Sequence, residues 1–223
     1  MIAKFQSSPY FTYLVRIVPF VAFAALTMMQ GSFGETGAYW LYTLKTLIGA
    51  LLIWIVWKYV KEMRWKFSWE AIVAGVVVFL LWVGLDGRYP FFFGNRDATF
   101  NPLQSYGEGN SLALIFIVIR VLGSSLVVPL LEEVFYRSFV YRVLAKSDFF
   151  SVPLSSLNWP AFIIVGVAFG FAHYEWLPGI LCAFIYQGLV IRKGRLGDAI
   201  TAHTITNFLL GLWVVYKSAY HFW

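Results

Sequence analysis

The chain has 223 residues, of which 60% are hydrophobic and only 13% charged, and its mean hydropathy is +0.72. A soluble domain is about 45–50% apolar and about 25% charged, so this composition excludes an ordinary soluble protein. The net charge of +6 does not indicate nucleic-acid binding, because the basic residues fall at the ends of apolar segments instead of forming one cluster. We expect an all-α, polytopic membrane helix bundle of about seven transmembrane helices in the lipid bilayer, as one domain over residues 1–223.

The first three spans are predicted at residues 11–30, 39–60 and 71–85. We expect the first apolar run to be retained instead of cleaved as a signal peptide, because Arg16 lies inside its start and no small-residue cleavage site follows. A basic stretch separates the second and third spans and should lie in the cytoplasm. It contains Lys58, Lys61, Arg64 and Lys66.

The loop at residues 86–110 mixes charges, turn residues and three consecutive phenylalanines (91–93), so we expect it not to span the membrane. Residues 111 to about 145 can form one long helix, which exceeds a hydrocarbon core of about 30 Å, so part of it must project. The remaining spans are predicted at residues 159–176, 178–191 and 199–216.

The distribution of Lys and Arg predicts the orientation of the chain. Most basic residues fall in loops on the side of the amino terminus, which the positive-inside rule places in the cytoplasm, with the carboxyl terminus outside. The single cysteine, Cys182, lies in an apolar run, so it excludes an internal disulfide and is expected to be a small buried residue.

Two adjacent carboxylates and an arginine interrupt the fourth predicted span. Ionisable groups at membrane depth are costly and usually mark function. Glu133 and Arg137 are four residues apart, so they share a helical face and can pair, whereas Glu132 is turned about 100° away. We interpret Glu133 as a structural carboxylate held by Arg137, and Glu132 as a chemical one. The alternative is a solvated helix end at which both acids meet water.

Two further polar groups lie in later spans. His173 is the one strongly polar side chain between Trp159 and Tyr174 in the fifth predicted span, and residues 203 and 207, a histidine and an asparagine, share a face of the seventh. Taken alone, His173 is equally typical of a hydrogen-bonded core histidine, and the His–Asn pair of polar packing between helices. Burying the Glu-Glu-Arg cluster, His173 and the His–Asn pair in apolar helices costs free energy in each case. One shared site explains all three.

Water activation is the chemistry that fits these side chains. A glutamate in apolar surroundings can act as a general base, a histidine can share the water proton, and a His–Asn pair can donate hydrogen bonds to a tetrahedral oxyanion. This set needs no Ser or Cys nucleophile, and three nearby serines are expected to serve packing: Ser124, Ser125 and Ser138. A zinc site built from one glutamate and both histidines is the competing account.

The ordered motifs Glu-Glu-x-x-x-Arg, Phe-x-x-x-His and His-x-x-x-Asn resemble those of the type II CAAX prenyl endopeptidases, within the wider CPBP or Abi-like glutamic intramembrane proteases. The resemblance covers about residues 112–216. It implies that Glu132 activates water, that His173 helps to hold it, and that His203 and Asn207 form the oxyanion hole. Two residues would support them: Glu133 and Arg137.

The resemblance also implies the kind of substrate. The family cuts near the carboxyl terminus of membrane-tethered proteins or peptides, and the chain looks like bacterial relatives that accompany exosortase-type sorting systems. We therefore expect a metal-free protease in a bacterial inner membrane, with its cavity between the fourth, fifth and seventh spans. A catalytically silent binding, immunity or assembly factor is the alternative. The seven expected spans differ from the eight of characterised prenyl-protease relatives.

Overall fold

The computed structural model describes residues 9–92 and 100–223, and the regular structure of these residues is helical, without strands. The predicted all-α membrane bundle is confirmed. The first elements are α2 (Pro9–Met28), the short turn η1 (Gln30–Phe33) and α3 (Gly34–Val56). They are followed by the turn η2 (Lys61–Met63), α4 (Trp69–Leu85) and the short helix α5 (Pro102–Tyr106).

One continuous helix of 35 residues runs from Ser111 to Ala145, as the sequence predicted. It is not α-helical throughout. Two π-helical stretches, η3 (Gly123–Val127) and η4 (Glu133–Val140), alternate with three α-helical ones. The α-helical parts are α6 (Ser111–Leu122), α7 (Val128–Glu132) and α8 (Tyr141–Ala145).

Pro129 gives a physical reason for the first π stretch. Its ring removes a backbone N–H and crowds the preceding turn, and a wider turn relieves this conflict. The N–H of Val128 reaches back five residues to the carbonyl of Gly123, which is the π pattern. In the same pattern residue 129 would donate to Ser124, and proline cannot. The Ser124 carbonyl is therefore left for another donor.

The last part of the chain contains η5 (Phe149–Ser151), α9 (Trp159–Phe171), α10 (Trp176–Lys193), α11 (Gly197–Lys217) and η6 (Tyr220–Phe222). α9 and α10 form a hairpin whose close approach requires glycine. A Cβ on Gly170 would lie 2.3 Å from Ile180 Cγ1 and 2.7 Å from the Trp176 carbonyl. Small residues at such contacts let helix backbones meet.

Two predicted spans had the wrong ends. α9 ends at Phe171, whereas the prediction ran to residue 176, because the polar run from His173 to Glu175 forms a turn that leads into α10. α3 begins at Gly34, inside the stretch predicted as a turn before residue 39. Glu35 in its first turn suits the positive end of the helix dipole.

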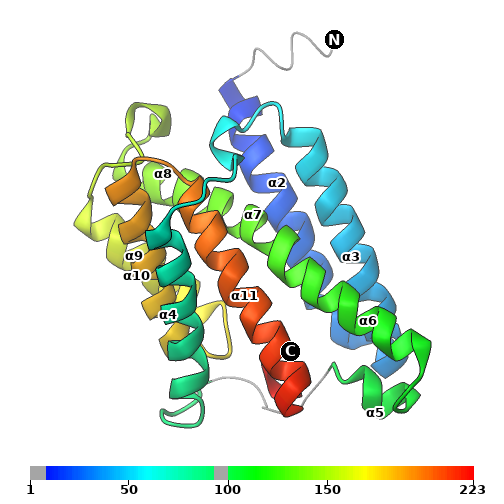
Figure 1. Cartoon of the computed structure of the whole chain (residues 1–223). Helices are drawn as coiled ribbons and strands as arrows, with labels where there is room; N and C mark the ends of the chain where they lie inside the picture. The colour runs from blue at the N-terminus through cyan, green and yellow to red at the C-terminus, as the bar shows by residue number, and fades with distance from the viewer. Residues whose placement is uncertain (1–8, 93–99) are drawn as a thin grey trace, which may run out of the picture.

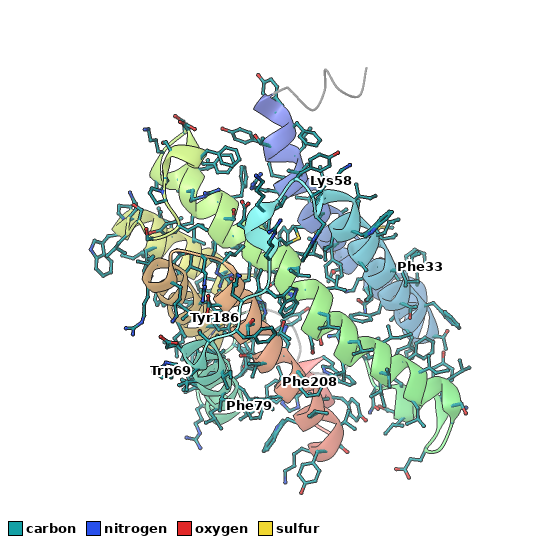
Figure 2. All side chains as sticks on the ribbon, turned by 45° about the horizontal axis from the view of Figure 1, so that its top comes forward. Phe33, Lys58, Trp69, Phe79, Tyr186 and Phe208 are labelled. Atoms are coloured by element: carbon teal, nitrogen blue, oxygen red, sulfur yellow. The ribbon has the colours of Figure 1, made fainter. Side chains whose placement is uncertain are left out.

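Four helices are long and apolar enough to cross a membrane: Tyr10–Met28, Gln30–Val56, Ser111–Ala145 and Gly197–Lys217. Trp69–Leu85 and Trp159–Phe171 are shorter apolar helices, and α10 occupies the sixth predicted span. A helix thus stands at each of the seven predicted positions in the described residues. Large apolar side chains such as Trp69 and Phe33 point outward at the edge of the bundle (Figure 2). The protein is an integral membrane protein.

α11 runs through the bundle with α4 and α10 on one side and the long helix on the other (Figure 1). Gly75 of α4 allows the closest approach, because a Cβ there would lie 2.6 Å from the Ala202 carbonyl of α11. α2 begins at the end of the bundle where α8 ends and α11 starts, and α11 itself ends at the opposite end, where α5 also lies (Figure 1). This arrangement brings the middle of the long helix against the first half of α11.

Candidate active site

Glu133, Arg137 and His203 form a buried polar group between the long helix and α11. His203 Nδ1 donates to Glu133 Oε1 at 2.9 Å, since a carboxylate only accepts, and Arg137 Nη1 lies 3.3 Å from the same oxygen. The exposed fractions of Glu133 and Arg137 are 0% and 1%. The predicted Glu133–Arg137 pair is confirmed. The bond to His203, a residue 70 positions away, was not predicted.

Glu132 faces the other nitrogen of the same imidazole. Its Oε2 lies 3.9 Å from His203 Nε2, and its side chain is 16% exposed. The distance is too long for a hydrogen bond, but an oxygen atom beside the pair can lie about 2.8 Å from both. Among the described residues, Oε2 of Glu132 and Oε2 of Glu133 are buried without a hydrogen-bond partner. The arrangement can therefore hold a water molecule, because such oxygens accept hydrogen bonds readily.

His173 lies in the turn after α9, not within a helix as predicted. Its Nδ1 donates to the Phe169 carbonyl at 2.8 Å, which leaves Nε2 of the neutral ring as an acceptor. The Phe169 ring lies near both histidines, with its centroid 4.7 Å from the His173 ring and 6.4 Å from the His203 ring. Both imidazoles are thus neighbours of one phenyl ring.

The Asn207 side chain makes the hydrogen bond to a helix carbonyl that Pro129, which has no N–H, cannot make. Its Nδ2 donates to the Ser124 carbonyl at 2.8 Å, across the contact between α11 and η3. One of its two amide protons is thereby committed, and the other remains for a ligand. Asn207 was expected to act together with His203, and the structure places it one turn along α11 on a bond of its own.

Tyr186 of α10 is a site neighbour that the sequence did not reveal. Its ring lies 5.4 Å from the His203 ring, and Figure 2 shows it among the helices. Thr206 donates to the Gly75 carbonyl at 2.7 Å, so its oxygen accepts the Tyr186 hydroxyl proton at 2.6 Å. This chain of bonds joins α10, α11 and α4 at the level of His203. In the sequence Tyr186 is one tyrosine in a predicted apolar helix, and nothing there indicates that it lies beside His203.

Arg137 is enclosed by aromatic rings as well as by Glu133. Its guanidinium carbon lies 4.2 Å from the centroid of Phe169, the ring that neighbours both histidines. A cation over a ring face is attracted by the ring quadrupole. Phe169 therefore connects the supporting arginine with both imidazoles.

The predicted water-filled cavity stays a prediction. Two apolar grooves have volumes of about 230 and 440 Å³ and lie between α3 and the long helix and between α6 and α11. Neither is lined by the six predicted site residues. Within residues 9–92 and 100–223, no three His, Cys, Asp or Glu side chains are arranged to hold a metal ion.

The family model described as type II CAAX prenyl endopeptidase Rce1-like matches residues 113–209. This segment of the chain is similar to the Rce1-like family. It contains all six predicted site residues, and the predicted resemblance is confirmed. Searches of curated proteins and of solved structures returned no match. The match to the model of an endopeptidase family supports a peptidase activity for this membrane protein.

Proposed function

We propose that the protein is an intramembrane endopeptidase that hydrolyses a peptide bond near the carboxyl end of a membrane-tethered protein or peptide. The observation that carries the proposal is the position of Glu132 Oε2, which is buried without a hydrogen-bond partner and lies 3.9 Å from His203 Nε2. The match to the Rce1-like family model supports the reaction class.

In the proposed reaction Glu132 takes a proton from water, and the hydroxide oxygen bonds to the carbonyl carbon of the substrate. The carbonyl oxygen becomes an oxyanion that accepts a hydrogen bond from the second amide proton of Asn207. The carbon–nitrogen bond then breaks, and the amine leaves with the proton from Glu132. His173 Nε2, which its own Nδ1–H bond leaves as an acceptor, helps to hold the water.

His203 contributes to the oxyanion hole only as a doubly protonated ring. Its Nδ1 proton goes to Glu133, so a second proton on Nε2 is needed for donation to the oxyanion. The bond to Glu133 Oε1 fixes the orientation of the His203 ring. Arg137 in turn offsets part of the charge on Glu133. We assign Glu133 and Arg137 supporting roles on this ground.

The isosteric change Glu132→Gln tests the proposal. We expect it to abolish processing while the protein stays folded, because an amide cannot accept the proton of water. Mass spectrometry can compare the carboxyl-terminal peptides in membranes of cells with the wild-type or variant protein, whichever membrane protein is the substrate. Glu108→Gln, at an exposed loop carboxylate, is the matched control. Identical peptide sets from the wild-type protein and the Glu132→Gln variant would contradict the proposal.

The proposed mechanism uses no metal, so a chelator should leave processing unchanged. Zinc that stays bound through purification and is needed for turnover would replace Glu132 as the activator of water. We further propose a bacterial inner-membrane location, with the start of α2 inside. The basic residues of the η2 region and of the turn between α10 and α11 lie at that end of the bundle, which supports this orientation (Figure 1).

A further inference from the structure

The turn that carries His173 is bonded to α9 through the Gly170 and Phe169 carbonyls, and it has further contacts outside that helix. α9 ends at Phe171, and residues 172–175 form a turn before α10. The His173 ring is bonded to the Phe169 carbonyl, and the indole of Trp82 meets it edge-on at 5.7 Å between centroids. These contacts orient the ring, but the backbone of a turn is less constrained than that of a helix.

The loop at residues 86–92 packs against this turn from outside the helices. The Tyr89 hydroxyl donates to Glu175 Oε2, and Trp176 Nε1 donates to the Pro90 carbonyl at 2.8 Å. Glu175 is only 7% exposed, although it stands in a connection between helices. Two hydrogen bonds therefore join the loop to Glu175 and Trp176, the two residues that follow the exposed Tyr174.

Aromatic stacking extends the same contact. The Trp176 ring is stacked on Phe171, with centroids 5.6 Å apart and ring planes 4° apart, so the residues on either side of the turn are clamped together. Phe92 lies 5.2 Å from Trp176 on the loop side. Burial raises the pKa of Tyr89, and the neighbouring Glu175 carboxylate raises it further, so the hydroxyl keeps its proton for the bond.

The loop is anchored at its other end as well. Asp86 accepts from His221 Nε2 at 3.1 Å, which ties the end of α4 to the segment after α11. The loop therefore joins three elements: α4, the turn after α9, and the end of the chain that the structure describes.

We propose that Tyr89 and Glu175 are positioning residues that fix the turn carrying His173. The inference rests on the proposed function, in which His173 holds the water. Neither residue lies in the three motifs that define the resemblance, and neither touches the reacting atoms in this assignment.

Histidine ring signals test the inference without using cleavage. The chain has three histidines, so the NMR signals of the folded, histidine-labelled protein can be assigned with His173→Gln and His221→Gln. We expect Tyr89→Phe and Glu175→Ala each to shift or broaden the His173 signal, and to leave the His203 signal in place. Glu175→Gln keeps an acceptor oxygen for Tyr89 and should restore the wild-type signal. Tyr174→Phe, at an exposed hydroxyl in the same turn, is the matched control.

Cleavage of the membrane substrate, measured from the carboxyl-terminal peptides, provides the second readout. Tyr89→Phe and Glu175→Ala should each lower it by about tenfold, since small displacements of a reacting group are costly. The double variant should be no worse than either single one, because both remove the same contact. An unchanged His173 signal in folded Tyr89→Phe would overturn the inference, as would equal changes in all three histidine signals. If Glu132→Gln processes normally while Tyr89→Phe still moves the His173 signal, only the proposed function fails.

Discussion

The Arg137 side chain is large, charged and 1% exposed, and its stabilising effect depends on its partner Glu133. We predict that Arg137→Met lowers the free energy of unfolding by about 3–5 kcal/mol, because it leaves a carboxylate buried without its arginine. Thermal or denaturant unfolding in detergent measures the change. Arg192→Met is the control, since Arg192 also pairs with a glutamate but is 70% exposed, and it should cost at most about 1 kcal/mol. Equal losses in both variants would contradict the prediction.

Local spacing predicted the pairing of Glu133 with Arg137, since residues four apart share a helical face. It could not predict that His203 bonds to Glu133, because that contact depends on how α11 packs against the long helix. The same holds for Tyr186, whose position beside His203 comes from the packing of α10. The sequence thus indicated which side chains carry the chemistry, but only the packing of the helices gives their partners.

Pro129 connects the geometry of a helix with the position of Asn207. Pro129→Ala restores a backbone N–H that can compete for the Ser124 carbonyl, to which Asn207 now donates. We predict that processing falls by about tenfold, a fraction of the effect of losing an oxyanion donor, while the unfolding temperature does not fall, since alanine favours a helix over proline.

The control for this variant is Pro160→Ala in the first turn of α9, where the N–H of the residue has no carbonyl to meet within the helix. It should leave processing unchanged. Full processing by Pro129→Ala would show that the Asn207–Ser124 bond does not matter for the reaction.

The apolar runs predicted where the helices are, but not how each one ends. The fifth predicted span was extended through His173 because its aromatic neighbours continue the apolar run, and the turn at 172–175 shows that polar side chains decided the end. The π stretches were also beyond prediction in detail, although Pro129 marks one of them. A proline inside an apolar helix signals a local change without specifying its form.

Glu62 holds the end of the bundle where α2 begins. It accepts hydrogen bonds from Arg16 at 2.6 Å and from Ser138 at 2.6 Å, and so joins α2 to η4. Burial alone would raise the pKa of Glu62, but Arg16 and Ser138 outweigh it and lower the pKa below its ordinary value. A lowered pKa gives stability that is present above the unfolded-state value of about 4.3 and is lost as pH falls through the folded-state value.

We therefore predict that the unfolding temperature falls as pH is lowered from about 5 to 3, and that Glu62→Gln weakens this dependence. Unfolding scans at a series of pH values measure it. Glu108→Gln, at an exposed carboxylate, should retain the wild-type dependence. A pH dependence that is the same in Glu62→Gln and in the wild-type protein would contradict the role of Glu62.

The orientation of the whole molecule can be tested with its single cysteine. In a Cys182→Ala background, Arg192→Cys should react with a membrane-impermeant thiol reagent only after the cells are opened, and Lys217→Cys should react from outside. The reason is that basic loops stay in the cytoplasm and α11 separates the two positions. The reverse pattern would place the start of α2 outside.

The π stretch that begins at Glu133 has a consequence for how this chain can evolve. A π turn is equivalent to an α-helix with an inserted residue, and each residue of an α-helix corresponds to a rotation of about 100°. Removing one residue between 134 and 140 would therefore let this stretch close to a regular α-helix, whereas removing one from the α-helical residues 128–131 would turn the two carboxylates by that angle against the part of the helix that precedes them. A single codon deletion in the second place could separate the acids from the imidazoles in a descendant, even though every side chain of the site was inherited intact, while the π stretch could absorb one.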